Sequence, residues 1–274
     1  MSAGGSPHPP EKLYEGYIFD LDGTIYLGDE LLPGAKELVE RLRELGRRLV
    51  FLSNNPTRDP AMYAGKLTRL GLPTPEREIV NTVVTMTRWL VENRPGAAVF
   101  PIAEEPLRRA LREAGVHLSE NPEEIEVVVA SYDRTFDYRK LRIAFDAIWY
   151  HGRAELVTTN PDRYCPLPGG RGEPDAAAIV AAIEASTGAR CTLNAGKPSR
   201  VMLEAALDAL GLEQGECLVV GDRLYTDIKM ATDAGMDSAL VLTGDSGIED
   251  VQRAPEHERP TYVLDRIDRL LPGG

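Results

Sequence analysis

Two aspartates follow directly after a short apolar run near the start of the chain. The run, Gly16–Phe19, predicts a strand, and Asp20 and Asp22 stand at its end with Gly23 next. Residues two apart point the same way while a chain is extended, and a glycine then permits a sharp turn. Carboxylates at the carboxyl end of a parallel strand lie where open α/β sheets bind ligands, and they suit a metal-assisted reaction. The alternative is a common Asp-Gly turn without a chemical role.

A hydroxyl and a short run of amides follow the second predicted strand. That strand, residues 48–52, leads into Ser53, Asn54 and Asn55. Such a hydroxyl, together with exposed backbone N–H groups, can hold a phosphate without net positive charge. Serine and asparagine serve equally well as helix or turn caps, and this segment taken alone favours a cap.

A lysine occupies a turn between a later predicted strand and a predicted helix. Lys197 stands between Gly196 and Pro198, and Gly196 allows another backbone to approach closely. The chain has only six lysines. A lysine in this turn is either a solvated charge or a ligand for an anion at the strand end, and the segment alone does not decide between them.

A further apolar run, residues 217–220, leads into a second acidic loop. Asp222 follows it and Asp227 comes five residues later, where a helix is predicted to begin. Asp222 is a suitable oxygen ligand for Mg²⁺, which binds a few carboxylates and keeps several waters. Asp227 is either a helix N-terminal residue favoured by the dipole or an acid that holds a metal-bound water.

All four segments lie just past the carboxyl ends of predicted strands, so they can converge at one edge of a sheet. Their inventory is two neighbouring carboxylates, a distant carboxylate, a hydroxyl with amides, and one lysine. In phosphoryl transfer, a metal ion and a lysine balance the charge on the phosphoryl oxygens. The combination therefore predicts a site for magnesium-assisted phosphoryl transfer.

The elements that must position these residues alternate between short apolar runs and longer helical stretches, which indicates an α/β protein with a mainly parallel sheet. A separate block begins near Asn81 and is long enough for a small α/β domain of its own. The expected division is residues 1–80, 81–190 and 191–274. The predicted strands are 16–19, 48–52, 97–102, 126–131, 155–158, 191–194, 217–220, 238–242 and 262–264. The predicted helices are 33–45, 60–70, 104–114, 137–150, 175–187, 199–210 and 227–234.

Composition narrows the possible partners. The chain has 274 residues and a formal net charge of −12, which excludes a general attraction to nucleic acid or to an anionic membrane. No apolar run approaches the ~18–20 residues that span a bilayer. A phosphate must therefore be bound locally. The three cysteines are odd in number and form no CxxC pair, which favours a reducing, cytoplasmic location.

At these four segments the sequence resembles phosphatases of the haloacid dehalogenase (HAD) superfamily. More narrowly, it resembles their class IIA group of NagD-like and 4-nitrophenylphosphatase-like proteins. The resemblance implies a Rossmann-like core, residues 1–80 and 191–274, with residues 81–190 inserted as an α/β cap domain. The motifs that carry it, in order, are Asp20-Leu21-Asp22-Gly23-Thr24, Ser53-Asn54-Asn55, Gly196-Lys197-Pro198 and Gly221-Asp222-Arg223-Leu224-Tyr225-Thr226-Asp227.

The resemblance also implies roles for the residues. Asp20 would be the nucleophile that forms an aspartyl-phosphate, and Asp22 would be the general acid and base. Mg²⁺ would be bound by Asp20, the backbone carbonyl of Asp22, Asp222, and Asp227 through a water. The implied phosphate ligands are Ser53, Asn54 and Lys197.

The cap is expected to select the leaving group. Asn160 and Asp162 follow the predicted strand 155–158 and are candidate substrate contacts, although a turn at the strand end is slightly favoured. The Gly/Pro-rich segment 166–174 is expected to be a connecting loop rather than a nucleotide-binding loop. The expected substrates are small phosphorylated metabolites resembling sugar phosphates, with 4-nitrophenyl phosphate as an artificial one. Phosphoglycolate, glycerol phosphate or nucleotide hydrolysis, and phosphotransfer on the same core, remain alternatives. A homodimer is expected from the resemblance alone.

Overall fold

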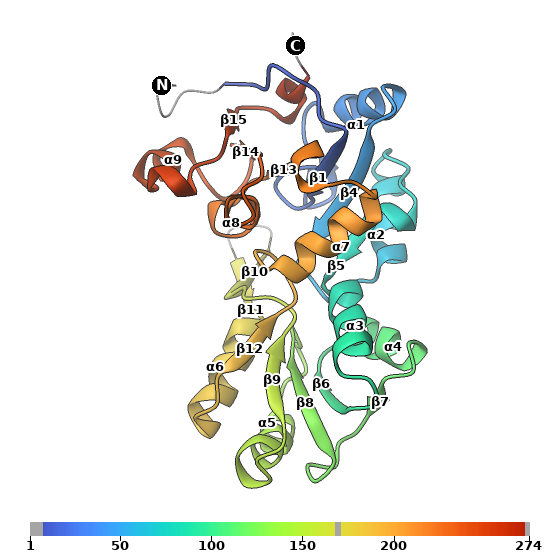
Figure 1. Cartoon of the computed structure of the whole chain (residues 1–274), viewed down its shortest axis with the longest axis vertical. Coiled ribbons are helices and arrows are strands. Elements are labelled where there is room, and N and C mark those ends of the chain that lie inside the picture. The colour runs from blue at the N-terminus through green and yellow to red at the C-terminus, as the bar shows by residue number, and fades with distance from the viewer. Residues whose placement is uncertain (1–7, 168–170, 272–274) are drawn as a thin grey trace. The chain divides into compact units, whose positions relative to one another are not determined.

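The structure is a computed structural model that describes residues 8–167 and 171–271. The described residues form two compact units, which we call the first and the second unit. The first unit holds the residues up to Ser53, Ala61–Val80 and those from Leu203 onward. The second unit holds Asn54–Pro60 and Asn81–Met202. Each unit has one main sheet with helices beside it (Figure 1).

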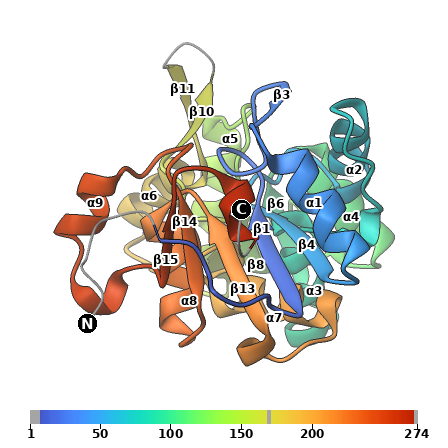
Figure 2. The same cartoon turned by 90° about the horizontal axis from the view of Figure 1, so that it is seen from above.

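A six-stranded sheet organises the first unit. In sheet order, its strands are β15 (Tyr262–Leu264), β14 (Ser238–Val241), β13 (Cys217–Gly221), β1 (Gly16–Asp20), β4 (Arg48–Ser53) and β5 (Ile79–Asn81). Figure 2 shows β14, β13, β1 and β4 side by side. The pairs from β15 to β4 are parallel, and Phe19 of β1 lies opposite Val220 and Phe51. All five residues of β1 are buried, which is typical of a strand covered on both faces.

The largely aliphatic core of this unit contains a stack of aromatic rings. Tyr17 stacks on Phe19 with 5.9 Å between ring centroids, and Phe19 stacks on Phe51 at 5.8 Å. Leu38 and Leu42, four residues apart on one helix, are fully buried in the same cluster. This packing fixes the direction of β1 and β4 at the ends where the predicted site residues begin. The helices that lie wholly or mostly in this unit are α1 (Ala35–Glu44), α2 (Pro60–Arg69), α7 (Arg200–Leu210), α8 (Lys229–Asp233) and α9 (Ile248–Arg253).

A five-stranded parallel sheet organises the second unit. In sheet order, its strands are β12 (Cys191–Asn194), β9 (Glu155–Thr158), β8 (Ile125–Ala130), β6 (Ala98–Ile102) and β7 (His117–Leu118). Side chains alternate between its faces: Val127 and Val129 pack into one core cluster, and Val128 and Ala130 pack into another. Both faces are therefore buried. The helices of this unit are α3 (Thr82–Asn93), α4 (Glu105–Glu113), α5 (Tyr138–Phe145) and α6 (Ala176–Thr187).

The predicted fold class, α/β with mainly parallel sheets, is confirmed. Some elements were not predicted: the hairpin of β2 (Tyr26–Leu27) and β3 (Glu30–Leu31), strand β5 and helix α3. The prediction that residues 166–174 form a connecting loop was wrong, because β10 (Tyr164–Leu167) and β11 (Arg171–Pro174) form an antiparallel pair. Residues 168–170 lie outside the described residues. The predicted helix 137–150 is α5 followed by a π-helical turn, Asp146–Tyr150.

The predicted domain boundaries, residues 1–80, 81–190 and 191–274, stay a prediction. The contacts group the chain somewhat differently, since β12 is hydrogen-bonded to β9 and so belongs with the second unit. Residues 54–60 also belong with that unit. Among the helices of residues 8–167 and 171–271, none is both long and apolar enough to cross a membrane.

Candidate active site

Three buried carboxylates meet at one end of the first sheet. Asp20 is the last residue of β1, Asp222 follows β13, and Asp227 lies in a π-helical turn after it, Leu224–Ile228. The three exposed fractions are 9%, 2% and 1%. Each residue offers one carboxylate oxygen, and these oxygens lie within 4.8 Å of one another. The parallel pairing of β1 with β13 brings them together, because it aligns the two strand ends.

This carboxylate cluster suits a divalent cation. Ionised carboxylates this close repel one another, and a cation among them offsets that repulsion. Their hard oxygen atoms are the ligands that Mg²⁺ prefers. The negative charge of the cluster also affects Arg223. Burial lowers the pKa of the Arg223 guanidinium, but the neighbouring carboxylates, chiefly Asp222, outweigh burial and raise that pKa.

Glycines and backbone amides hold Asp222 in place. Its Oδ2 accepts a hydrogen bond from the Asp245 N–H at 2.8 Å, and its backbone carbonyl accepts one from Ser246 at 3.0 Å. A Cβ on Gly244 would lie only 2.0 Å from Oδ2 of Asp222, and one on Gly23 would lie 2.5 Å from it. Both positions therefore require glycine. Residues 244–246 were missed by the sequence analysis, although their Gly-Asp-Ser composition after a predicted strand was a signal.

Asp227 is held by its own turn. Its Oδ2 accepts hydrogen bonds from the Arg223 N–H at 3.2 Å and the Thr226 hydroxyl at 3.4 Å. A Cβ on Gly221 would lie 2.3 Å from the Asp227 side chain, so the strand end must be glycine for this carboxylate to fit. Asp227 is thus both part of a helical turn and a member of the carboxylate cluster.

Asp22 has different surroundings from Asp20. It is exposed, and its Oδ2 accepts a hydrogen bond from the Tyr26 hydroxyl at 3.1 Å. Gly23, the residue after Asp22, has a φ of 93°, which permits a sharp turn directly after the two aspartates. Burial, together with the charge of Asp22, raises the pKa of Tyr26 far above its ordinary value, so the phenol remains a donor. A buried lysine, Lys66, places its Nζ 3.6 Å from the centroid of the Tyr26 ring.

Ser53 ends β4, the strand on the other side of β1. Asp20 is in register with Leu52, so Ser53 lies one residue beyond that pair, at the same sheet end as the carboxylates. The Ser53 side chain is buried, and its Oγ lies 2.7 Å from the Tyr63 hydroxyl. The first unit therefore brings together five of the predicted site residues, namely Asp20, Asp22, Ser53, Asp222 and Asp227.

The other four predicted residues lie in the second unit and are joined there by hydrogen bonds. Asn54 binds both sides of one residue: its Oδ1 accepts from the Lys197 N–H at 2.7 Å, and its Nδ2 donates to the Lys197 carbonyl at 3.2 Å. Nδ2 also donates to Oδ2 of Asp162 at 2.9 Å. Both amide hydrogens of the Asn54 side chain are thus used internally. If Asn54 binds a phosphate, its backbone N–H is the group left to do so.

Asn160 is wholly internal. Its side chain is fully buried, Nδ2 donates to Asp162 at 3.0 Å and to Asp175 at 2.9 Å, and Oδ1 accepts from the Thr159 hydroxyl at 2.8 Å. A side chain in this position cannot reach a substrate without breaking those bonds. The observation favours the turn over the substrate contact for Asn160.

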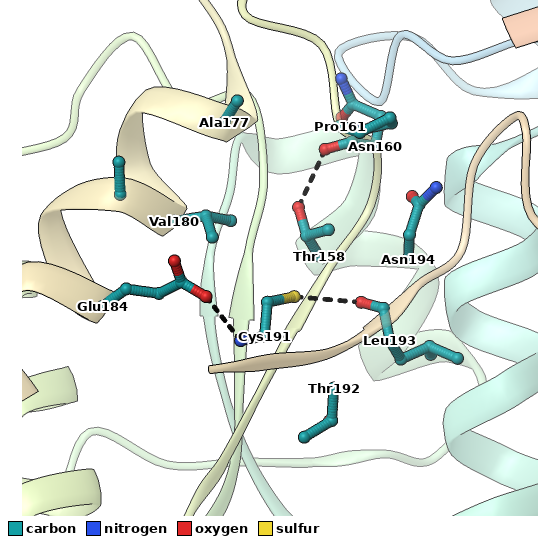
Figure 3. A pocket seen from close by; sticks show the side chains of 11 residues that line it. Thr158, Asn160, Pro161, Ala177, Val180, Glu184, Cys191, Thr192, Leu193 and Asn194 are labelled. Atoms are coloured by element: carbon teal, nitrogen blue, oxygen red, sulfur yellow. Dashed lines mark hydrogen bonds between the residues drawn. The ribbon is translucent and has the colours of Figure 1, made fainter. Parts of the chain in front are cut away.

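The second unit also contains a cavity of about 370 Å³ beside β12 and α6 (Figure 3). In Figure 3, the Thr158 hydroxyl lies against the Asn160 carbonyl, to which it donates at 3.0 Å. The lining includes one glutamate, Glu184, and no lysine or arginine, so it does not suit a phosphate. The lining residues are Thr158, Asn160, Pro161, Ala177, Val180, Ala181, Glu184, Cys191, Thr192, Leu193 and Asn194.

Comparison with known proteins gives consistent matches over most of the chain. The family model described as haloacid dehalogenase-like hydrolase matches residues 17–117, and a HAD-hydrolase-like model matches residues 194–270. The chain is 39% identical over 252 residues to the sugar-phosphatase AraL of Bacillus subtilis (strain 168), which covers 92% of this chain and 90% of that protein. It is 33% identical to the 5'-nucleotidase YutF of the same organism, covering 95% and 99%.

A solved structure also matches closely. The crystal structure of a 4-nitrophenylphosphatase from Thermotoga maritima superposes with a TM-score of 0.87 at 35% sequence identity. The match covers 94% of this chain and 96% of that one. The similarity therefore extends over both units and not only over the carboxylate cluster.

Proposed function

The chain belongs to the haloacid dehalogenase-like hydrolase family and to the phosphatases within it, and from that premise we propose that it is a Mg²⁺-dependent phosphomonoesterase of small phosphorylated metabolites. Membership confirms the resemblance carried by the four motifs. The observation that supports the proposed reaction most directly is the cluster of Asp20, Asp222 and Asp227, with Asp22 exposed two residues after Asp20.

Two aspartates divide the chemistry in this proposal. A carboxylate oxygen of Asp20 attacks phosphorus, the bond from phosphorus to the ester oxygen breaks, and Asp22 gives its proton to that leaving oxygen. Asp22 then takes a proton from water as the water oxygen attacks the aspartyl-phosphate, which releases phosphate and restores Asp20. The contrast in surroundings supports this division, since Asp20 lies in the buried cluster and Asp22 is exposed to solvent.

Mg²⁺ would be held by the carboxylates of Asp20 and Asp222, the backbone carbonyl of Asp22, and Asp227 through a water. When bound, it neutralises charge on the phosphoryl oxygens and on the carboxylates. The residues themselves keep Asp222 and Asp227 oriented through the backbone N–H groups of Asp245 and Arg223. This arrangement lets a chain with a net charge of −12 bind an anion.

The phosphate ligands in this proposal are the Ser53 hydroxyl, the Asn54 backbone N–H and the Lys197 ammonium group. Ser53 and Lys197 are both buried, and an ammonium group kept from water interacts more strongly with a phosphate than an exposed one does. Lys197 would also orient Asp20.

The leaving group is proposed to be sugar-like. Of the similar proteins, AraL is named a sugar phosphatase and YutF a 5'-nucleotidase, so nucleotides are the second candidate. Phosphoglycolate, glycerol phosphate and transfer to an acceptor hydroxyl remain alternatives. We further propose a cytoplasmic location, which the free cysteines Cys165, Cys191 and Cys217 favour, and a homodimer.

The test is phosphate release from sugar phosphates, glycerol phosphate, phosphoglycolate, nucleoside monophosphates and 4-nitrophenyl phosphate, with Mg²⁺ and with EDTA. The proposal expects turnover that EDTA abolishes and that Asp20→Asn reduces by at least about 10³-fold without unfolding the protein. An Asp20→Asn variant as active as the wild type would contradict the nucleophile. A rate that rises only with an added alcohol acceptor would favour phosphotransfer.

A further inference from the structure

We propose that Asp162, at the base of the β10–β11 hairpin, is a positioning residue for the phosphate-binding turn at Lys197, and that it acts through the side chain of Asn54. The proposal rests on the proposed function, because it assumes that Lys197 binds the phosphoryl group. It differs from both roles considered for Asp162 in the sequence, a substrate contact and a turn at the strand end.

The Asn54 side chain makes two hydrogen bonds to the backbone of Lys197. A side-chain amide that accepts from the N–H and donates to the C=O of the same residue fixes the orientation of that residue's backbone. The two distances are 2.7 and 3.2 Å. Space is also tight here, since a Cβ on Gly196 would lie 2.7 Å from Oδ1 of Asn54 and 2.6 Å from the Thr159 carbonyl. The turn therefore depends on where the Asn54 amide lies.

Asp162 in turn orients the Asn54 amide through a hydrogen bond. Oδ2 of Asp162 accepts from Nδ2 of Asn54 at 2.9 Å, which fixes which end of the amide is nitrogen and which is oxygen. A flipped amide would place an N–H group against the Lys197 N–H. Hydrogen bonds to a carboxylate are stronger than neutral ones, so Asp162 is well suited to this task.

Asp162 is itself positioned by a hydrogen bond from Asn160. Nδ2 of Asn160 donates to the same Oδ2 at 3.0 Å and to Asp175 at 2.9 Å. Asp175 is buried and caps helix α6, where its Oδ1 accepts from the Ala176 N–H at 2.6 Å. The hydrogen bonds thus run from a helix N-terminus to the lysine turn through four side chains. Chains of this kind polarise and rigidify one another.

The two roles for Asp162 make different kinetic predictions. A residue that contacts the leaving group changes KM, and it does so differently for each ester. A residue that positions Lys197 changes kcat by a similar factor for every ester, because all esters present the same phosphoryl group. A misplacement of about 1 Å in a catalytic group costs on the order of 100-fold in rate.

The experiment measures kcat and KM of the full chain for 4-nitrophenyl phosphate, glucose 6-phosphate and AMP in Asp162→Ala, Asp162→Asn and Asn54→Ala. Asp162→Ala is expected to lower kcat about 10- to 100-fold by the same factor for all three. Asp162→Asn keeps an acceptor oxygen and should recover most of that loss. The double variant Asn54→Ala/Asp162→Ala should be no worse than Asn54→Ala, since both act on one contact. Asp137→Ala, which removes the α5 cap elsewhere in the second unit, is the control and should leave kcat unchanged.

Phosphate binding provides a readout that does not need turnover. Calorimetric affinity for inorganic phosphate should fall about tenfold in Asp162→Ala and stay unchanged in Asp137→Ala. Loss of activity toward one ester only would overturn the proposal in favour of a substrate contact. A lower melting temperature with unchanged kcat and unchanged phosphate affinity would overturn it in favour of a purely structural role. If the wild type binds phosphate but hydrolyses none of the esters, the proposed function fails and the affinity comparison still decides the role of Asp162. If the wild type does neither, both proposals fail.

Discussion

Gly244→Ala tests whether the position of the Asp222 carboxylate sets the activity. The added Cβ would lie 2.0 Å from Oδ2 and 2.5 Å from Cγ of Asp222. Real Cβ atoms essentially never come within 3.0 Å of such an atom, so the carboxylate or the loop must move by about 1 Å. Oδ2 is also the atom that the Asp245 N–H holds at 2.8 Å, so the shift breaks or stretches that hydrogen bond.

The size of the effect follows from this displacement. A shift of about 1 Å in a group that positions the reaction costs on the order of 100-fold in rate. That factor corresponds to about 2.7 kcal/mol of transition-state stabilisation. We expect Gly244→Ala to lower kcat/KM for 4-nitrophenyl phosphate by about 100-fold and to raise the Mg²⁺ concentration needed for half-maximal rate.

The assay is a Mg²⁺ titration of initial rates, with circular dichroism and thermal unfolding to establish that the variant is folded. Gly215→Ala is the matched control, because a Cβ there meets no atom within 4 Å. It should behave as the wild type does. Wild-type activity and wild-type Mg²⁺ dependence in a folded Gly244→Ala variant would refute the reasoning.

Three further substitutions probe other contacts. Tyr26→Phe removes the hydroxyl that donates to Asp22 and should lower kcat about tenfold with little change in KM; steady-state kinetics giving an unchanged kcat would count against a role for that bond. Burial raises the pKa of the Cys217 thiol to about 11, so its contribution to the free energy of unfolding is complete below about pH 9 and is lost as the pH rises toward 11. Denaturant unfolding should show about 2–3 kcal/mol more loss over that range in the wild type than in Cys217→Ala, and parallel curves would show this to be wrong. Lys140→Met leaves the buried carboxylate of Asp133 without its 2.6 Å ammonium partner and should destabilise the protein by about 3–5 kcal/mol. Burial raises the pKa of Asp133, but hydrogen bonds from Lys140 and Thr135 outweigh burial and lower it, so this stabilisation is present above the ordinary aspartate pKa of about 4 and fades as the pH falls; equal melting temperatures at pH 7 would contradict it.

The strands that carry the carboxylates could be predicted from the sequence because their signals are local. Gly16–Asp20 and Cys217–Gly221 are short apolar runs that end at acidic loops, and neither pattern depends on distant residues. Helix α3 was missed because its first turn, Thr82-Val83-Val84-Thr85, consists of β-branched residues, which lower helix propensity. Its N-terminus is fixed instead by the Asn81 side chain, which accepts from the Val84 N–H at 3.2 Å.

Other features could not be predicted because they are tertiary. The residues adjacent to Gly244 in the sequence do not indicate that the carboxylate of Asp222 lies against it. The commitment of both Asn54 amide hydrogens to Lys197 and Asp162 depends on partners more than a hundred residues away. The pairing of β10 with β11 overrides a sequence rich in proline and glycine, which by composition alone favours a loop.

The order of strands in the first sheet has a consequence for folding during synthesis on the ribosome. Strand β1 pairs with β13, so Gly16 cannot form its pair until Cys217 has been synthesised, about 200 residues later. At roughly 5–20 residues per second, that delay is on the order of 10–40 s. During it, the apolar flank of β1 has only β4 beside it, whereas the sheet of the second unit is built from one nearly continuous stretch and can close earlier. The nascent chain therefore exposes an aggregation-prone strand edge for most of its translation, and its yield in cells should depend on chaperone capacity and on elongation rate.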